Sequence, residues 1–187
     1  MSDGIIAALI DCGRQLHDSN LNAGTAGNLS ALLGDGRVVM SKRRVRKAAL
    51  TADDFVVFDP DRPDARALER ASTEYRLHIE SYRASPEVCA VVHAHPPALT
   101  AIGIRRGSFP PVLPELDAVV GPIVICPYEP SGSDGLAQAV GRAVGRGAGV
   151  VILKRHGVVA VGGSVAHALD RLELAENAAQ TILLAER

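Results

Sequence analysis

The 187-residue sequence predicts an α/β fold, namely a three-layer α/β/α sandwich around a central mixed or antiparallel sheet. Segments with the apolar periodicity of helices alternate loosely with short β-branched runs. They do not follow a strict strand–helix–strand rhythm, which argues against a doubly wound parallel sheet. A chain of this length buries about 70% of its unfolded surface as one domain. Because no repeat or long linker divides it, residues 1–187 are predicted to form a single domain.

The first third of the sequence predicts one helix, one loop and two strands. Apolar residues fall roughly on one helical face over 3–18. The stretch 20–30 is rich in Gly and Asn, which tolerate positive φ, so it is predicted to be a loop. Short strands are expected over 37–41 and 55–59.

The middle of the chain contributes a helix, a strand, a loop and a further strand. Residues 72–84 contain no helix breaker and begin with two hydroxyl residues, which are common at helix starts. The run 88–95 is β-branched and stops at a pair of prolines, which predicts a strand with histidines at its exit. The proline-rich stretch 109–114 predicts an ordered surface loop, and 123–127 predicts another short strand.

The last part of the sequence predicts two helices with two strands between them. The first helix is expected over 133–146, and apolar strands over 149–154 and 158–161 are separated by a glycine turn. Ser164 is placed to cap a long final helix, whose apolar positions recur with helical periodicity as far as Leu183.

Charge balance excludes several classes of partner. With 20 basic and 21 acidic residues the formal net charge is −1, so no global field attracts nucleic acid or an anionic membrane. The basic run KRRVRK (42–47) could bind nucleic acid locally, but few aromatic residues accompany it. A solvated or interface charge cluster is the favoured interpretation, and we expect no nucleic-acid partner.

Cysteine usage and the N-terminus indicate a cytoplasmic protein. The three cysteines, Cys12, Cys89 and Cys126, are odd in number, far apart and without a C-x-x-C pair. This pattern argues against a disulfide framework and against a thiolate zinc site. The N-terminal stretch has no basic segment before its apolar residues, so we expect neither a signal peptide nor a membrane span.

Two histidines at a strand exit form the first candidate metal motif. His93 and His95 are two residues apart, so their side chains project to the same face of a strand and can converge on one ion. A catalytic zinc site needs a third protein ligand. The other histidines of the chain are His17, His78, His156 and His167. His156 is the preferred third ligand because an apolar strand ends there, and the alternative is that these are buried histidines satisfied by hydrogen bonds.

A carboxylate and two hydroxyls form the second candidate motif. Glu74 follows Ser72 and Thr73 at the expected helix start, where free backbone N–H groups and the helix dipole favour an anion. The loop 24–30 offers further free amides. A carboxylate beside such a cradle and near a metal could act as a general base. The alternative is ordinary helix capping, and His78 could either pair with the carboxylate or pack in the core.

Five segments carry a resemblance to a known family. They are GTAGNLS (24–30), LTADDFVVFD (50–59), STEYRLHIESYRASPEVCAVVHAHPP (72–97), CPYEPSGSDGLAQAV (126–140) and LKRHGVVAVG (153–162). In this order they resemble the class II aldolase/adducin family, which includes L-fuculose-phosphate aldolase and L-ribulose-5-phosphate 4-epimerase. The resemblance covers essentially the whole chain.

The resemblance implies a metal-dependent lyase of carbohydrate metabolism. It would be an aldolase that cleaves a small phosphorylated or anionic hydroxy-carbonyl compound through a metal-stabilised enediolate. His93, His95 and His156 would hold Zn²⁺, or another cation such as Mn²⁺, Co²⁺ or Fe²⁺. Glu74 would ligate the free metal and act as the catalytic acid/base. Relatives with the same site also decarboxylate, dehydrate or epimerise sugar phosphates and sugar acids, whereas a non-catalytic adducin-like module would be expected to lose the histidines.

The resemblance also implies an assembly and a set of substrate contacts. The family forms homotetramers with active sites at subunit interfaces. Gly27, Asn28, Ser72 and Thr73 match the positions that contact the substrate phosphate.

Two positions depart from the family pattern. Sugar-phosphate aldolases carry Thr-Gly or Ser-Gly where this chain has Arg43 and Arg44, so a small-residue cradle has become cationic. These arginines could bind an anionic substrate, or point to solvent or across a subunit boundary. Where the fuculose-phosphate enzymes carry a proton-donating tyrosine, this chain has Pro114, with Glu115 as a speculative substitute.

Overall fold

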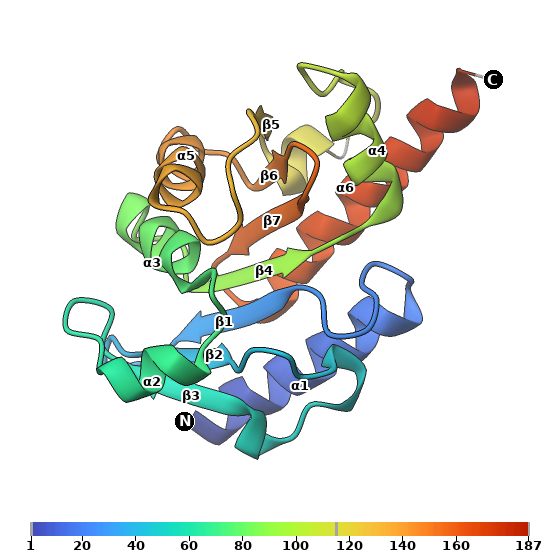
Figure 1. Cartoon of the computed structure of the whole chain (residues 1–187). Coiled ribbons are helices and arrows are strands. Elements are labelled where there is room, and N and C mark those ends of the chain that lie inside the picture. The colour runs from blue at the N-terminus through green and yellow to red at the C-terminus, as the bar shows by residue number, and fades with distance from the viewer. Residues whose placement is uncertain (1, 115, 187) are drawn as a thin grey trace.

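The computed structural model describes residues 2–114 and 116–186 (Figure 1). Its centre is a seven-stranded sheet with the order β3-β2-β1-β4-β7-β6-β5. The strands are β1 (Asn28–Leu32), β2 (Val38–Ser41), β3 (Phe55–Phe58), β4 (Ala90–Ala94), β5 (Ile123–Cys126), β6 (Val150–Leu153) and β7 (Gly157–Gly162). All neighbouring strands are antiparallel except β5 and β6, which are parallel. The predicted mixed sheet is therefore confirmed.

Helices cover both faces of this sheet (Figure 1). They are α1 (Ser2–Asp18), α2 (Ala65–Arg70), α3 (Tyr75–Ala84), α4 (Pro97–Arg105), α5 (Asp134–Gly145) and α6 (Val165–Ala185). Short 3-10 turns η1 (Lys47–Ala49) and η2 (Ala52–Asp54) and a π-helical turn η3 (Leu116–Val120) complete the described elements. Helices α1, α4 and α6 pack on one face and α3 and α5 on the other, which confirms the three-layer sandwich.

Strand residues alternate between two hydrophobic cores, as the pleat requires. In β6, Val150 and Ile152 belong to the core under α1, α4 and α6. Val151 and Leu153 belong to the core under α3 and α5. Because both faces are covered, the central strands are apolar at nearly every position, and the polar side chains that do lie in the sheet are exceptional.

The prediction that residues 20–30 form a loop was wrong at its C-terminal end. Asn28 to Ser30 belong to β1, which pairs with β2 on one side and with β4 on the other. Asn28 lies opposite His93 in the β1–β4 register. Pairing on both edges overrides the low strand propensity of Asn, since strand preference depends mainly on tertiary context.

The helix predicted from residue 72 begins later, at Tyr75, with Glu74 as its N-cap residue. Ser72 and Thr73 form the turn before it, where the Ser72 hydroxyl accepts a hydrogen bond of 3.3 Å from the Glu74 backbone N–H. The start of α3 therefore leaves a buried carboxylate and two hydroxyl residues side by side.

Helices α2 and α4 were not predicted. Helix α4 directly follows His95 and begins at Pro97, and the carboxylate of Glu176 in α6 accepts hydrogen bonds from Ala98 N (2.9 Å) and Leu99 N (2.8 Å). This cap comes from the distant final helix, so the only local signal of the helix start is Pro97 at its first position. Glu115 lies outside the described residues.

None of the helices in the described part of the chain has the length and apolar character needed to cross a membrane.

Candidate active site

Three histidines converge at the ends of central strands of the sheet. His93 is the penultimate residue of β4, His95 follows that strand, and His156 lies in the tight turn between β6 and β7. Gly157 makes the convergence possible. A Cβ atom at Gly157 would lie 2.5 Å from His95 Cδ2 and 3.1 Å from His93 Cε1, so only glycine leaves room for the two rings.

The three rings present nitrogen atoms to a common centre. Their centroids are 4.9 to 5.4 Å apart, and one ligand atom from each lies within 4.8 Å of the others. His93 Nδ1 lies 3.0 Å from the Val158 carbonyl oxygen and must donate to it. In the neutral ring, His93 Nε2 therefore carries a lone pair, and it lies 3.2 Å from His95 Nε2.

Burial favours the neutral form of His95 and His156, which is the form that metal ligation requires. Burial is the main cause that lowers the pKa of His95 to about 4, with smaller contributions from His93 and His156. Burial also lowers the pKa of His156, with His93 acting in the same direction and Glu74 opposing.

The cluster fits a tetrahedral divalent cation. Ligand atoms about 2.0 to 2.1 Å from such an ion lie about 3.3 Å from one another. The 3.2 Å between His93 Nε2 and His95 Nε2 matches this spacing. Imidazole nitrogens suit Zn²⁺ and other borderline cations, and the three histidines could hold one of them.

Glu74 lies against the histidine cluster and is 6% exposed. Its Oε2 lies 3.1 Å from His93 Nε2, and its Oε1 lies 3.2 Å from His156 Nε2. Two further side chains orient it. Asn28 Nδ2 donates to Oε2 over 3.0 Å, and the Ser131 hydroxyl donates to Oε1 over 2.9 Å.

These contacts favour the ionised carboxylate. Burial by itself would raise the pKa of Glu74, but the hydrogen bond and positive charge of a protonated His93, the charge of a protonated His156 and the Ser131 hydroxyl outweigh burial. A cation held by neutral rings would supply the same positive charge beside the carboxylate. The pKa of Glu74 is consequently held well below its usual range. At neutral pH the group is an acceptor, ready to ligate a cation or to take a proton.

A cavity of about 390 Å³ opens beside the cluster. Its wall includes His95, His156 and Glu74, and also all the predicted substrate contacts: Gly27, Asn28, Arg43, Arg44, Ser72 and Thr73. These residues come from five separate segments of the chain, which meet at one cavity.

The backbone conformation and the close surroundings of residue 27 require glycine. Its φ of +69° falls in the left-handed region, and a Cβ there would lie 2.4 Å from the His93 carbonyl oxygen. Gly27 thus allows its loop to approach the strand that carries the histidine.

Cationic side chains also line the cavity. Arg43 donates from Nε to the Ala71 carbonyl and from Nη2 to the Leu68 carbonyl, both over 3.3 Å. Arg44 is exposed, has a φ of +60° and makes no hydrogen bond or ion pair with the described residues. The structure places both arginines on the cavity wall rather than away from it.

Buried Lys47 ties together two loops of this cavity. Its ammonium group donates to the Val45 carbonyl over 2.8 Å and to the Thr25 carbonyl over 3.3 Å. Burial lowers the pKa of Lys47 to about 8, against an opposing contribution from Asp54. The contacts fix the loop that carries the arginines relative to the loop before β1.

Sequence reasoning did not single out Ser131 or Lys42, which also line the cavity. Ser131 lies in the segment PSGSD, where the nearby Ser133 caps α5 by accepting from Leu136 N over 3.1 Å. The two serines share a turn-like context, so the sequence did not distinguish the one that faces Glu74. Lys42 was noted only as part of the basic run.

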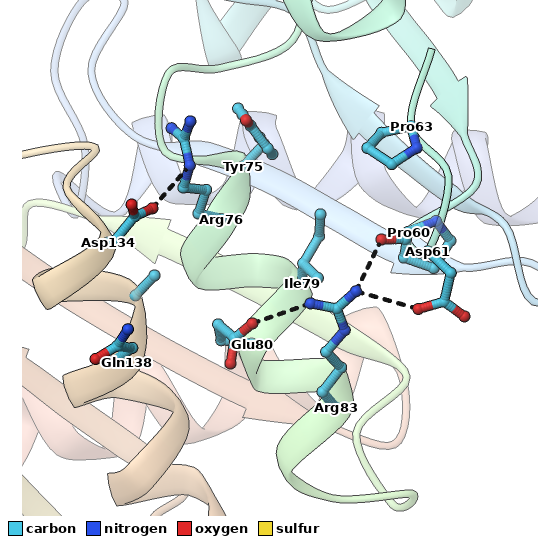
Figure 2. A pocket seen from close by; sticks show the side chains of 11 residues that line it. Pro60, Asp61, Pro63, Tyr75, Arg76, Ile79, Glu80, Arg83, Asp134 and Gln138 are labelled. Atoms are coloured by element: carbon cyan, nitrogen blue, oxygen red, sulfur yellow. Dashed lines mark hydrogen bonds and ion pairs between the residues drawn. The ribbon is translucent and has the colours of Figure 1, made fainter. Parts of the chain in front are cut away.

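A second cavity of about 300 Å³ lies on the surface between α3 and α5 (Figure 2). Arg83 pairs there with Asp61 and Glu80, each over 3.1 Å, and Arg76 pairs with Asp134 over 3.0 Å. Since its charged groups neutralise one another, this cavity offers weaker chemistry than the histidine cluster.

Comparison with known proteins relates the whole chain to one group of enzymes. The family described as Class II Aldolase and Adducin N-terminal domain matches residues 7–183. A 5-methylthioribulose-1-phosphate/5-deoxyribulose-1-phosphate aldolase of Escherichia coli O45:K1 is 32% identical over 155 residues, which cover 82% of this chain and 71% of that protein.

Two further comparisons cover more of the fold. A methylthioribulose-1-phosphate dehydratase of Gluconacetobacter diazotrophicus is 31% identical over 180 residues, 91% of this chain and 88% of that protein. The crystal structure of L-fuculose-1-phosphate aldolase from Thermus thermophilus superposes with a TM-score of 0.87 and 28% identity. That superposition covers 97% of this chain and 94% of the other.

Proposed function

The chain belongs to the class II aldolase and adducin family and is a lyase, and on this premise we propose that it cleaves a carbon–carbon bond in a small phosphorylated or anionic hydroxy-carbonyl compound. One observation carries the proposal. The carboxylate of Glu74 lies 3.1 Å from His93 Nε2 and 3.2 Å from His156 Nε2, on the wall of a cavity that Arg43 and Arg44 also line.

We assign His93, His95 and His156 as the residues that hold one divalent cation. Zn²⁺ suits three imidazole nitrogens best, with Mn²⁺, Co²⁺ and Fe²⁺ as the alternatives. When bound, the cation supplies Lewis acidity that polarises a substrate carbonyl.

Glu74 is the proposed acid/base residue. Its carboxylate is anionic and borders the cavity, so it can take a proton from the carbon beside a substrate carbonyl. In the cleavage direction the carboxylate takes the proton of the substrate hydroxyl β to the carbonyl as the carbon–carbon bond breaks, and the protonated carboxyl then delivers that proton to the enediolate carbon left behind. Asn28 and Ser131, which donate to its two oxygens, hold the carboxylate in place.

The substrate anion is proposed to bind between the arginine wall and the start of α3. Free N–H groups at a helix start favour a phosphate, and the Ser72 and Thr73 turn lies there beside the cavity. Gly27 and Asn28 border the same space, while Arg43 and Arg44 add the fixed positive charge that bidentate phosphate recognition uses.

Dehydration is the second candidate reaction. The dehydratase of Gluconacetobacter diazotrophicus favours it, because that protein is 31% identical over 91% of this chain. The corresponding aldolase identity is 32% over 82% of this chain. Loss of water can also begin with removal of a proton beside a carbonyl, so the same carboxylate would serve. Decarboxylation and epimerisation of a sugar phosphate or sugar acid are further uses of the same residues.

Product analysis tests this proposal. The zinc-loaded protein is incubated with L-fuculose 1-phosphate and with 5-methylthioribulose 1-phosphate, and the products are identified by mass spectrometry. We expect either two carbon fragments, which indicate an aldolase, or loss of one water, which indicates a dehydratase. If neither compound is cleaved, dehydrated or epimerised, the proposed function is contradicted.

The assembly remains a prediction. We propose a homotetramer with active sites at the subunit interfaces, as the relation to the class II aldolase and adducin family implies. Light scattering on the purified protein measures the mass directly, and a monomer with full activity would contradict this proposal.

A further inference from the structure

A row of five buried polar side chains connects the interior of the fold with Glu74. It alternates between α3 and β1: Tyr82, Ser30, His78, Asn28 and Glu74, which together we term the polar ladder. Tyr82 Oη lies 2.5 Å from Ser30 Oγ, which lies 2.6 Å from His78 Nδ1. His78 Nε2 contacts Asn28 Oδ1, and Asn28 Nδ2 lies 3.0 Å from Glu74 Oε2.

The polar ladder follows from two interleaved periodicities. Glu74, His78 and Tyr82 are each four residues apart, so they share one face of α3. Asn28 and Ser30 are two residues apart, so they project from the same face of β1. The helix packs against that face, and the two sets interdigitate in a core where His78 and Ser30 are both 0% exposed.

The donors and acceptors of the polar ladder can be assigned from one end to the other. An ionised Glu74 only accepts, so Asn28 must turn its Nδ2 toward the carboxylate and its Oδ1 toward His78. Because Oδ1 only accepts, His78 Nε2 must carry a proton. In the neutral ring His78 Nδ1 then accepts from the Ser30 hydroxyl, and Ser30 Oγ in turn accepts from the Tyr82 hydroxyl.

The surroundings of His78 agree with a neutral ring. Both ring nitrogens have their hydrogen-bond needs met, one as a donor and the other as an acceptor. Complete burial is the main cause that lowers its pKa, to about 3, with His93 acting in the same direction and Glu74 opposing. One arrangement of protons therefore satisfies every ring and amide atom of the polar ladder.

We propose that the polar ladder positions the acid/base carboxylate by fixing the orientation of the Asn28 amide. His78, Ser30 and Tyr82 are thus positioning residues, and this inference rests on the proposed role of Glu74. Without the His78 donor, the Asn28 amide could rotate and turn its Oδ1 toward the carboxylate. Two acceptors would then face each other, and the Glu74 carboxylate would move away from the cavity.

The first test compares two buried serines. Ser30→Ala breaks the polar ladder, whereas Ser81→Ala removes an equally buried hydroxyl of α3 that donates to the Leu77 carbonyl over 2.7 Å and lies outside it. We expect Ser30→Ala to lower kcat by roughly 10-fold to 100-fold with little change in KM or zinc content, since misplacement by about 1 Å can cost about 100-fold. Ser81→Ala should keep the kcat of the wild type. Equal kcat values for the two variants would overturn the inference.

The second test uses rescue at His78. A glutamine side chain can donate to Asn28 from its nitrogen and accept from Ser30 with its oxygen, while leucine can do neither. We expect His78→Gln to recover most of the kcat that His78→Leu loses, at the same zinc content. Equal losses in both variants would indicate that His78 serves packing only, and would contradict a positioning role.

The third test needs no substrate. Long-range ¹H–¹⁵N NMR should report His78 as a neutral ring protonated at Nε2, and the Asn28 side-chain amide signals should shift in Ser30→Ala but not in Ser81→Ala. A His78 ring protonated at Nδ1 or at both nitrogens, or an unmoved Asn28 amide, would overturn the inference. These results stand even if no tested phosphate is turned over.

A double variant separates failure of this inference from failure of the proposed function. If Glu74→Gln has already removed the acid/base group, adding Ser30→Ala should cost little more, since residues that act through one another are not additive. A full additional loss would contradict the positioning role alone. A Glu74→Gln variant with normal turnover would instead contradict the proposed function.

Discussion

His93 Nε2 lies 3.1 Å from Glu74 Oε2. This contact joins the C-terminal end of the central strand β4 to the start of α3. The contact brings a candidate metal ligand and a candidate acid/base group to one centre. Glu74 keeps its hydrogen bonds from Asn28 and Ser131 when His93 is replaced, so substitutions at His93 are expected to affect chemistry more than fold.

Replacing Glu74 tests the acid/base assignment. Glu74→Gln retains the shape and the hydrogen-bonding oxygen but cannot carry the proton, so we expect at least about 100-fold loss in kcat with the metal content kept. Steady-state kinetics on the substrate identified by product analysis provides the measurement. The matched control is Glu80→Gln, on the same helix but paired with Arg83 over 3.1 Å. Near-normal turnover by Glu74→Gln would show that this residue only occupies the start of α3.

Gly157 should be required for cation affinity. An alanine Cβ would lie 2.5 Å from His95 Cδ2 and 2.6 Å from the Ala94 carbonyl oxygen, so the rings must shift. We expect Gly157→Ala to weaken zinc binding by about 10-fold to 100-fold, the usual cost of disturbing groups around the ligands. Competition with a chromophoric chelator measures the affinity. Gly34→Ala is the control, since nothing lies within 4 Å of a Cβ there; unchanged affinity in both variants would argue against the proposed ligand set.

Replacing Arg44 tests substrate recognition without lowering stability. Its left-handed φ of +60° is one that glycine adopts freely and that costs other residues about 1 to 2 kcal/mol. We expect Arg44→Gly to retain the stability of the wild type or exceed it slightly, and to raise KM for phosphorylated substrates only.

The comparison for Arg44→Gly is Arg46→Ala, which changes an exposed arginine of the same run that is not part of the cavity lining. KM is measured for a phosphorylated substrate and for its unphosphorylated analogue. A rise in KM for both compounds, or for neither, would reject anion recognition by Arg44.

His78 should contribute to acid sensitivity. Its pKa falls from 6.5 to about 3 in the folded chain, chiefly because it is buried. Between those values the unfolded chain binds a proton that the folded chain does not, so the free energy of unfolding decreases as the pH falls through this window. We expect His78→Gln to lose less stability than the wild type between about pH 6.5 and pH 3. Urea unfolding across that pH range measures the free energy of unfolding, and replacement of the exposed His17 by glutamine is the control. Parallel pH curves for the wild type and His78→Gln would contradict the prediction.

The sequence predicted those parts of the molecule that have local signals. His93 and His95 stand out because a β-branched run ends beside two prolines, and His156 because an apolar run ends at a glycine. Glu74 stands out as an acidic residue at a helix start. In each case the relevant chemistry and the local pattern lie within a few residues of each other.

Features that depend on distant partners were not predictable in this way. Asn28 was assigned to a loop because its propensity is poor for a strand, yet pairing with β2 and β4 places it in the sheet. The start of α4 is capped by Glu176 from the last helix. Ser131 reaches Glu74 only because α3 and α5 pack together, and His78 was left open between a carboxylate partner and a core residue. It contacts the Asn28 amide instead.

The central claim is that His93, His95 and His156 form one cation site with Glu74 beside it. Measuring the metal content tests this claim most directly. The purified protein is loaded with zinc, dialysed, and measured by inductively coupled plasma mass spectrometry together with the double variant His93→Ala/His95→Ala and with His156→Ala. Circular dichroism confirms that each variant is folded. We expect about one zinc per chain in the wild type and almost none in the variants, because fewer than three imidazoles remain. Full zinc occupancy in the folded double variant would contradict the claim.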